Sequence, residues 1–344
     1  MLNIAFSETG PVVSPTPLYE VPALARRAGV GKLLLKLENE RPLGNFKILG
    51  GMYAGLRVLA ERTGRTIPEL LARQGAARAL PRLICASDGN HGLSVAAAAR
   101  QAGAPATIYL HRGVNPVRAR RIEAFGASVA WVEGSYDDAV DAAEAAARDG
   151  AGILVADTSA DLSDPVVRHV MEGYATISRE LTAQLRRLEV RLSHCFVQAG
   201  VGGLAAALAE GLGAQVPKGA ITVVEPANAP CVTQALMDGA PHRLVGDLET
   251  SAEMLSCGLA SAPAFEILRA HGARGVTVSE AGLGAAPRLL AETAGVSTTP
   301  SGAAGLAGLL RVAADPALRT MHALRSDSSV LLIVTEAAIE DRPG

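Results

Sequence analysis

Residues 194–212 read HCFVQAGVGGLAAALAEGL, an apolar run that ends in a glycine-rich turn and continues as an alanine- and leucine-rich segment. Residues 194–199 predict a strand buried on both faces, and residues 203–212 predict the helix that follows it. Glycines at this junction let the backbone approach a phosphate, whose charge the start of the helix stabilises. The stretch lacks the Lys-Ser/Thr ending of a P-loop and the full spacing of a dinucleotide fingerprint, so a monophosphate fits better. Close packing of the helix on the strand is the alternative explanation of the same glycines.

The same alternation of strand and helix patterns runs along the whole chain. Further strands are predicted at 33–38, 106–111, 128–133, 152–157, 221–226, 275–280 and 329–336. Helical patterns cover 92–102, 116–125, 136–148, 165–187, 281–294 and 303–314. This order predicts an open α/β architecture with mostly parallel sheets, in which ligands bind beyond the carboxyl ends of the strands.

Composition narrows the class of protein. At 344 residues, of which 49% are hydrophobic, the chain can form two lobes or one large α/β domain. The net charge is −2 with both signs interspersed, so we expect no nucleic-acid partner. We expect no secretion signal and no membrane span, because the first residues lack a basic start and an apolar core and no apolar run is long enough. The cysteines are scattered, with no metal-ligand spacing, so we predict reduced thiols in a cytoplasmic protein without a metal site.

A lysine follows the first predicted strand in the stretch PLGNFK, residues 42–47. We interpret this stretch as a short turn. Lys47 lies next to an apolar Phe46, and partial desolvation there would lower the pKa of the amine and make it a nucleophile. Taken alone, an exposed lysine in a turn is the more common case.

A second polar motif, SDGNHG at residues 87–92, lies between the apolar run 83–86 and an alanine-rich helical pattern. Small residues at a helix start expose backbone N–H groups and form an anion-binding nest that suits a substrate carboxylate. A helix N-cap turn explains the motif equally well. His91 by itself is more often a packed or capping histidine than a catalytic one.

LKLEN at residues 35–39, then Lys47, then SDGNHG, and then GVGGLAAA at residues 200–207 follow one another along the chain. In this order of motifs the sequence resembles the fold-type II pyridoxal-5′-phosphate (PLP) enzymes. These include threonine and serine dehydratases, threonine synthase and the tryptophan synthase β subunit, and the resemblance runs from about Pro15 to Thr335. It implies two three-layer α/β lobes with mostly parallel sheets and PLP in the cleft between them. It places a small domain at 81–155, a large PLP-binding domain at 1–80 plus 156–344, and a homodimer.

The resemblance also assigns roles to single residues. Lys47 would hold PLP as a Schiff base and move the α-proton, and Asn90 would bind the phenolic oxygen of PLP. Thr335 would face the pyridine nitrogen with a hydroxyl, which does not enforce a protonated ring and so favours β-elimination. The cofactor-binding set is Phe46, Lys47, Asn90, Gly200, Val201, Gly202, Gly203, Leu204 and Thr335, and the substrate carboxylate would meet Ser87, Asp88, Gly89 and His91.

An aspartate before Gly-Asn-His-Gly is typical of one branch, the diaminopropionate ammonia-lyases. Asp88 could serve as a base for a D-configured substrate, and Asp157 could contact a second amino group, although helix N-capping would also explain Asp157. Pro300 and Leu259 depart from this branch, because acids are usual at both positions.

We therefore expect a PLP-dependent ammonia-lyase that eliminates across the α and β carbons of a small amino acid. The substrate would be 2,3-diaminopropionate or a related compound such as serine or threonine, and the products a 2-oxo acid and ammonia. A less acidic pocket would allow β-replacement by a second nucleophile instead. A non-catalytic PLP- or amino-acid-binding protein is the third alternative, since a fold does not establish a function.

Overall fold

The computed structural model describes residues 4–72, 80–87 and 89–338, which divide into two compact units. The first unit combines the residues up to Ser14 with Lys47–Thr176, and the second combines Pro15–Phe46 with the residues from Ile177 onward. The predicted small domain, 81–155, falls within the first unit, and the predicted domain bounds stay predictions.

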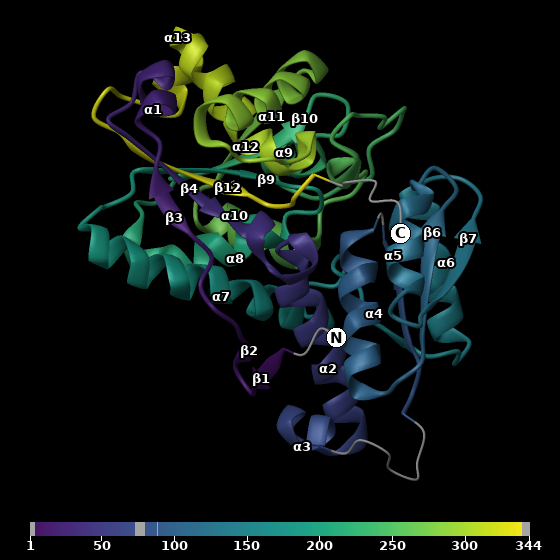
Figure 1. Ribbon diagram of the computed structural model, residues 1–344. Helices are drawn as coiled ribbons and strands as arrows, with labels where there is room; N and C mark the ends of the chain where they lie inside the picture. Colours follow the sequence, from purple (N-terminus) through teal and green to yellow (C-terminus); the bar gives the residue numbers. More distant parts are fainter. Residues whose placement is uncertain (1–3, 73–79, 88, 339–344) are drawn as a thin grey trace. The chain divides into compact units, whose positions relative to one another are not determined.

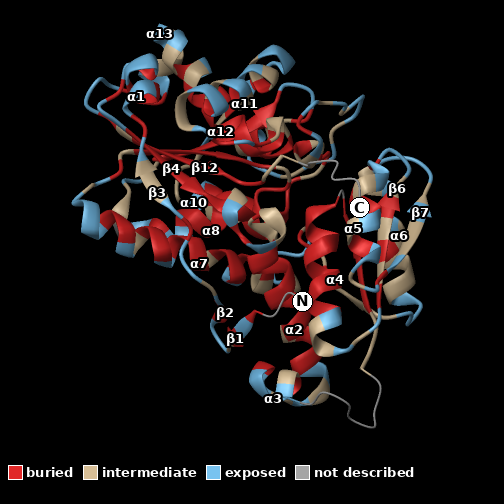
Figure 2. Ribbon diagram, viewed as in Figure 1, coloured by how far each residue is buried: buried red, intermediate tan, exposed pale blue. Residues whose placement is uncertain are grey.

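The second unit is built on a six-stranded sheet in the order β11-β10-β9-β12-β4-β3 (Figure 1). All neighbouring strands are parallel except β3, which is antiparallel to β4 at the edge. The strands are β3 (Leu18–Glu20), β4 (Lys32–Leu37), β9 (His194–Gln198), β10 (Ile221–Pro226), β11 (Arg274–Val278) and β12 (Ser329–Val334). The four central strands are buried along almost their whole length, as expected for a parallel sheet covered on both faces (Figure 2).

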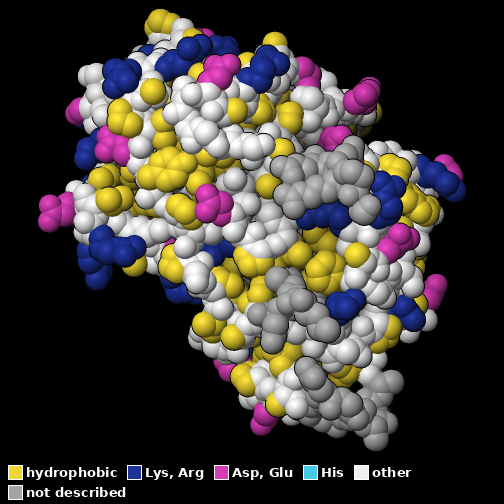
Figure 3. Space-filling view, viewed as in Figure 1, with side chains coloured by type: hydrophobic (Ala, Val, Ile, Leu, Met, Phe, Trp, Pro, Cys, Tyr) yellow, Lys and Arg dark blue, Asp and Glu magenta, His cyan; other side chains and the backbone are white. Residues whose placement is uncertain are grey.

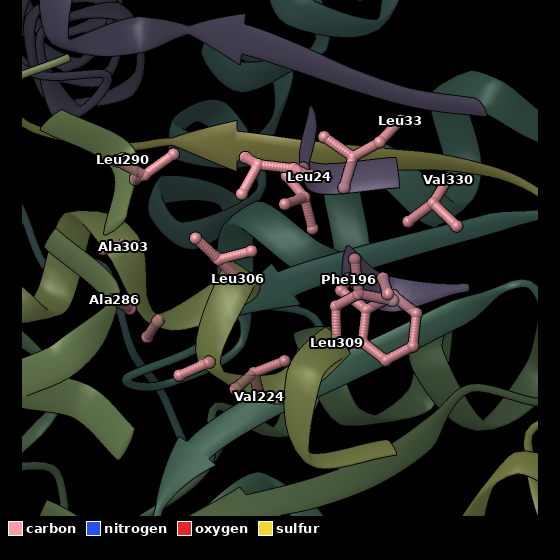
Figure 4. Close-up of a cluster of buried hydrophobic side chains, with 14 of the residues drawn as sticks. Leu24, Leu33, Phe196, Val224, Ala286, Leu290, Ala303, Leu306, Leu309 and Val330 are labelled. Atoms are coloured by element: carbon pink, nitrogen blue, oxygen red, sulfur yellow. The ribbon is translucent and has the colours of Figure 1, made fainter. Parts of the chain in front are cut away.

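Helices cover both faces of this sheet. One face carries α1 (Pro22–Ala28), α11 (Glu280–Ala294), α12 (Pro300–Ala314) and α13 (Pro316–Met321), and the other carries α8 (Gly203–Leu212), α10 (Ala262–Ala270) and the later part of α7 (Pro165–Leu188) (Figure 1). Helix α9 (Cys231–Asp238) follows β10. Leu306 and Leu309 of α12 lie among side chains of β9, β10 and α1, including Phe196 (Figure 4). Each such leucine contributes about 1.5–3 kcal/mol to folding through removal from water.

The first unit has a four-stranded parallel sheet in the order β7-β6-β5-β8. Its strands are β5 (Leu83–Ala86), β6 (Ala106–His111), β7 (Ser128–Val132) and β8 (Ile153–Leu154). Helix α6 (Tyr136–Arg148) covers one face with Ala139 and Ala143, while α4 (Asn90–Ala102) and α5 (Pro116–Glu123) cover the other. Helix α2 (Lys47–Thr63) packs on α4, α3 (Ile67–Ala72) follows it, and β1 (Ala5–Ser7) pairs with β2 (Gly10–Val12). The predicted three-layer α/β architecture with mostly parallel sheets is confirmed.

Every strand and helix that the sequence predicted has a counterpart in the structure, within a few residues at each end. The interpretation of residues 42–47 as a turn was wrong at its last position, because Lys47 is the first residue of the 17-residue helix α2. This helix is buried on nearly all sides and contains Gly50, Gly51 and Gly55, so it lacks the polar stripe by which a surface helix is identified. The strands β1, β2 and β3 were also missed, since each has only three residues.

A cluster of buried charges fixes the segment that precedes Lys47 in the chain. The Lys36 Nζ atom on β4 donates to Glu180 Oε2 of α7 at 2.6 Å and to the Thr16 carbonyl at 2.9 Å. The Arg41 side chain donates to Glu38 at 2.7 Å and to the same Glu180 oxygen at 2.6 Å. Opposite charges therefore balance within the interior, and removal of one partner would leave a buried charge uncompensated at a cost of about 3–5 kcal/mol.

Charged side chains of both signs are interspersed on the surface. The face shown in Figure 3 carries Lys and Arg side chains next to Asp and Glu side chains. Among the residues that the structure describes, no helix is both long and apolar enough to span a membrane.

Candidate active site

Lys47 and Asp157 form an ion pair within the first unit. Lys47 opens α2, Asp157 lies in the loop after β8, and the lysine Nζ atom pairs with Asp157 Oδ2. Asp157 is only 6% exposed. Burial by itself would raise the pKa of this carboxyl, but the charge of Lys47 and the lysine hydrogen bond, with a smaller contribution from the nearby His91 ring, hold the pKa well below its usual value. Asp157 does not cap a helix, because α7 begins eight positions later at Pro165.

Two tyrosines for which no role was predicted from the sequence lie near this pair. The Tyr136 hydroxyl, at the start of α6, donates to Asp157 Oδ1 at 3.5 Å. Burial raises the pKa of Tyr174 above its usual range against the opposing charge of Lys47, so the phenol is neutral. A Cβ atom at position 50 would lie 2.4 Å from the Tyr174 ring, so only a glycine at this position of α2 leaves enough space for the ring.

The motif at 87–92 folds as a tight turn that opens α4. Ser87 Oγ accepts hydrogen bonds from the backbone N–H groups of Gly89 and Gly92, both at 2.8 Å. Gly89 adopts φ +141°, a conformation that a residue with a side chain rarely adopts, and Asn90 is the first helical residue. Asp88 lies outside the described residues. The turn has the small residues and helix start that an anion-binding nest requires, and the role of Ser87, Gly89 and Asn90 in binding stays a prediction.

His91 lies in the interior beneath this turn. Its Nε2 atom is 2.7 Å from the Val155 carbonyl, and a carbonyl only accepts, so Nε2 carries the proton. The Nδ1 atom lies beside Gly51 of α2 and has no hydrogen-bond partner among the described residues. Burial lowers the pKa of the ring, which is therefore neutral at pH 7. These contacts give His91 a packing role, and its contact with substrate stays a prediction.

Arg118 of α5 is a further residue that the sequence did not single out. Its side chain is buried and packs on the turn, since a Cβ atom at position 89 would lie 2.7 Å from Arg118 Cδ. A buried guanidinium beside a carboxylate nest suits an anionic substrate. The sequence offered no local signal, because the two residues are far apart in the chain and meet only through the packing of α5 on α4.

The glycine loop of the second unit joins β9 to α8. Gly202 has φ +98° and is the N-cap of α8, so the N–H groups of Gly203 and Leu204 belong to the first helical turn and lack intrahelical acceptors. Gly200 is tightly enclosed, because a Cβ atom there would lie 3.0 Å from Cys257 Sγ. The Cys231 thiol donates to the Gly200 carbonyl at 3.2 Å. Gly200 allows close packing against residues 254–257, while Gly203 and Leu204 carry donors that suit a phosphate, and phosphate binding stays a prediction.

Thr335 lies directly after β12 and contacts the end of β9. The side-chain amide of Gln198 donates to Thr335 Oγ1 at 2.9 Å, and the backbone N–H of Phe46 donates to the Thr335 carbonyl at 3.1 Å. Phe46 immediately precedes Lys47. Among the described residues we find no acceptor for the hydroxyl proton of Thr335.

These groups fit PLP. The first turn of α8 supplies donors for a phosphate, and the Thr335 hydroxyl retains one proton for an acceptor such as a pyridine nitrogen. Lys47 offers a primary amine for an aldehyde, and its ion pair with a buried carboxylate holds that amine at a defined position.

Comparison with known proteins identifies the family. The sequence profile of the family described as pyridoxal-phosphate dependent enzymes matches residues 10–336.

This chain belongs to the family of pyridoxal-phosphate dependent enzymes.

Its relatives include the diaminopropionate ammonia-lyase of Salmonella typhimurium, which is 32% identical over 97% of this chain and 87% of the relative. The L-threonine ammonia-lyase of Thermotoga maritima is 27% identical over 87% of this chain and 67% of the relative. The crystal structure of the holo diaminopropionate ammonia-lyase from Escherichia coli superposes with a TM-score of 0.84 at 30% identity, covering 94% of this chain and 85% of that one. The predictions of a fold-type II PLP enzyme and of a PLP-dependent ammonia-lyase are confirmed.

The structure also clarifies one departure from the ammonia-lyase pattern within this PLP enzyme. Pro300, at the place of an expected acid, is the first residue of α12, and the Thr299 hydroxyl before it hydrogen-bonds Glu336. Glu336 is buried and also accepts, through its carbonyl, from Thr298. A carboxylate is therefore present beside this helix start although position 300 lacks one. The structure gives no comparable substitute for Leu259.

Proposed function

We propose that this protein converts 2,3-diaminopropionate and water into pyruvate and two molecules of ammonia. One ammonia is the leaving group from the β carbon, and the other is released when the remaining imine is hydrolysed. The proposal rests on one observation, the buried and ionised Asp157 beside Lys47.

Asp157 favours a substrate with a second amino group. In the cofactor-free chain the carboxylate is balanced by Lys47, and a β-ammonium group would supply the equivalent positive charge at the same place. In the cofactor-free chain this carboxyl is ionised at neutral pH, because the charge and hydrogen bond of Lys47 hold its pKa low. A β-ammonium group in place of the lysine charge would keep it ionised, and an ionised carboxylate is not a general acid. Loss of the hydroxyl from serine needs a proton donor, whereas a β-ammonium group departs as ammonia without one. Asp157 therefore suits diaminopropionate better than serine or threonine.

The remaining residues hold and orient the reactants. When bound, PLP supplies the electron sink for the carbon that loses its proton. The N–H groups of Gly203 and Leu204 would hold its phosphate, with Val201 and Gly202 shaping the loop, and Asn90 would bind its phenolic oxygen. Lys47 would move the α-proton of an L-configured substrate, and Asp88 would do so from the other side for a D-configured one. A relative, the diaminopropionate ammonia-lyase of Escherichia coli, has been crystallised with D-serine.

The experiment measures pyruvate, 2-oxobutanoate and ammonia formed by the purified PLP-loaded enzyme from D- and L-diaminopropionate, serine and threonine. We expect diaminopropionate to give the highest kcat/KM. Absence of an oxo acid from every substrate would overturn the lyase proposal, and a new amino acid formed in the presence of an added thiol would instead establish β-replacement.

Asp157→Asn tests the residue that carries the proposal. We expect kcat/KM for diaminopropionate to fall about 100-fold, because the ammonium loses a charged partner, while the value for serine changes by less than about tenfold. Asp161→Asn is the matched control, since this exposed aspartate lies in the same loop and bonds only to Ser163 and its neighbours. An equal loss for both substrates would contradict the assignment of Asp157 to the second amino group.

We also propose that the enzyme is a cytoplasmic homodimer. The support is the resemblance to fold-type II enzymes together with four buried cysteines that are free thiols in the structure. Light scattering during gel filtration should give twice the mass of the chain, and fractionation of source cells should place the protein in the cytoplasm. A monomer at micromolar concentration or a membrane-bound fraction would contradict the respective part.

A further inference from the structure

Gln198 is the last residue of β9, and its side chain lies between α12 and the end of β12. It is 3% exposed, and its Nε2 atom lies 2.9 Å from the Gly302 carbonyl, 3.1 Å from the Ile333 carbonyl and 2.9 Å from Thr335 Oγ1. The two carbonyl oxygens only accept hydrogen bonds. The nitrogen side of the amide must therefore face this group, and the orientation of the amide follows from chemistry alone.

This orientation determines what the Thr335 hydroxyl can do. Because the amide nitrogen donates to Oγ1, Thr335 uses its oxygen as the acceptor and keeps its own proton for donation elsewhere. The amide nitrogen carries two protons and faces three acceptors, the Gly302 and Ile333 carbonyls and Thr335 Oγ1, so one of its protons is shared between two of them. Within the described part of the chain no other acceptor contacts the hydroxyl.

We propose that Gln198 is a positioning residue that makes the Thr335 hydroxyl a hydrogen-bond donor to the pyridine nitrogen of PLP and thereby keeps that nitrogen unprotonated. The inference rests on the proposed placement of Thr335 at the pyridine ring. A nitrogen that accepts a hydrogen bond from a neutral hydroxyl has its lone pair occupied, whereas a carboxylate at this position would favour the protonated ring. Gln198 thus influences how strongly the PLP ring withdraws electrons, and it acts through Thr335 without contacting the cofactor.

The geometry around Gln198 leaves it no second arrangement. A Cβ atom at Gly305 of α12 would lie 3.0 Å from Gln198 Oε1 and 2.8 Å from the Phe196 carbonyl, so the glycine allows α12 to approach the amide closely. Rotation of the amide by 180° would put Oε1 against the Gly302 and Ile333 carbonyls, and adjacent acceptors repel each other. The hydroxyl of Thr335 is consequently held in one hydrogen-bonding state.

The test uses the holoenzyme reconstituted with PLP labelled with ¹⁵N in the pyridine ring. In the wild-type enzyme we expect the ¹⁵N chemical shift of an unprotonated, hydrogen-bonded pyridine. In Gln198→Leu we expect the shift to move toward that of a pyridine without a hydrogen bond, because the Thr335 oxygen loses its donor and the hydroxyl proton is no longer held in one orientation. Thr335→Val should move the shift at least as far, while Thr335→Ser, which keeps the hydroxyl, should restore the wild-type value. We also expect Gln198→Leu and Thr335→Val to weaken PLP binding to the apoenzyme by about fivefold to tenfold.

Val197→Ala is the matched control, since it shortens a buried side chain on the same strand without removing a donor, and its ¹⁵N shift should equal the wild-type value. If Gln198→Leu does not take up PLP, Gln198→Glu keeps the length of the side chain and the same readout applies. A wild-type shift in the Gln198 variant together with a changed shift in Thr335→Val would overturn the role of Gln198. A protonated nitrogen in the wild-type enzyme would overturn it as well. These outcomes are independent of the lyase proposal, which fails only if no substrate yields an oxo acid.

Discussion

The Lys47–Asp157 pair of the first unit is partly buried and the Gln198–Thr335 pair of the second is fully buried, and they are held in opposite ways. The first is an ion pair whose charges depend on whether the lysine amine is free. The second is a set of neutral hydrogen bonds among a side-chain amide, a hydroxyl and two carbonyls, and none of these groups titrates near neutral pH.

The difference indicates a division of labour. A neutral network keeps the same geometry at every stage of a reaction, so it suits the groups that hold a cofactor in a fixed electronic state. When the lysine amine of an ion pair becomes covalently bound, its charge is lost and the buried carboxylate is stabilised by another cation, such as an ammonium group of the substrate. Such a pair therefore suits substrate selection. We infer that the glycine loop and Thr335 determine the cofactor, while Asp157 determines the substrate.

The largest expected effect comes from removing the charged partner. Lys47→Ala should lower kcat by at least about 1000-fold, because both covalent attachment and the base at the α carbon are lost. The neutral network should still bind PLP noncovalently. Activity assays, with mass spectrometry after borohydride treatment to detect covalently attached PLP, check both parts. Lys32→Ala, which alters an exposed lysine on β4, should leave activity unchanged, and full activity in Lys47→Ala would refute the assignment.

The stability of the second unit should depend on pH through His322, a residue outside the Gln198–Thr335 hydrogen-bond network. His322 is buried and its Nδ1 atom lies 3.1 Å from Thr222 Oγ1. Burial, with smaller contributions from Arg274 and His194, lowers the pKa of His322 from 6.5 to about 4. The His322 imidazole therefore binds a proton more readily in the unfolded chain than in the folded one. As a result, the free energy of unfolding should fall as the pH drops from about 6.5 to about 4. The loss from this group is at most about 3 kcal/mol.

Urea denaturation of the apoprotein between pH 8 and pH 4.5 measures this loss. His322→Gln should flatten the dependence between pH 6.5 and pH 4.5, whereas His242→Gln, at an exposed position, should leave it as in the wild type. An unchanged slope in His322→Gln would contradict the assignment of the acid sensitivity to this histidine.

The smallest effect is expected in the glycine loop. In Gly200→Ala the new Cβ atom would lie 3.0 Å from Cys257 Sγ and 3.1 Å from the Met254 carbonyl, so the loop must shift by a few tenths of an ångström. We expect the dissociation constant of PLP to rise about tenfold, because the phosphate donors move with the loop. Gly213→Ala, at a position with open space around the added atom, is the control. Fluorescence titration of the apoenzyme with PLP provides the measurement, and equal affinities in the two variants would show that the loop tolerates the shift.

The sequence predicted the longer strands of both units. Apolar runs such as 194–199 and 329–336 identified the central strands of the second sheet, because strands buried on both faces have no polar alternation to obscure them. Helix α2 was missed, since it is nearly all buried and carries three glycines. In the site, too, local patterns were predicted and packing was not. Gly200–Leu204 form one contiguous motif, whereas Tyr136, Tyr174 and Arg118 reach their places only through the packing of helices, which no local pattern encodes.

The pairing of β4 with β12 has a consequence for synthesis on the ribosome. Leu33 of β4 lies opposite Val330 of β12, so almost 300 residues must be made before β4, which pairs with β3 on its other side, gains its parallel neighbour. The first unit, whose strands β5 to β8 lie within residues 83–154, can form its sheet long before then. Contacts of such long range slow folding and leave β4 with an unpaired edge in the meantime. Because Lys47 follows β4 by only ten residues, the nascent chain contains the Lys47 amine long before β12 and Thr335 have been made.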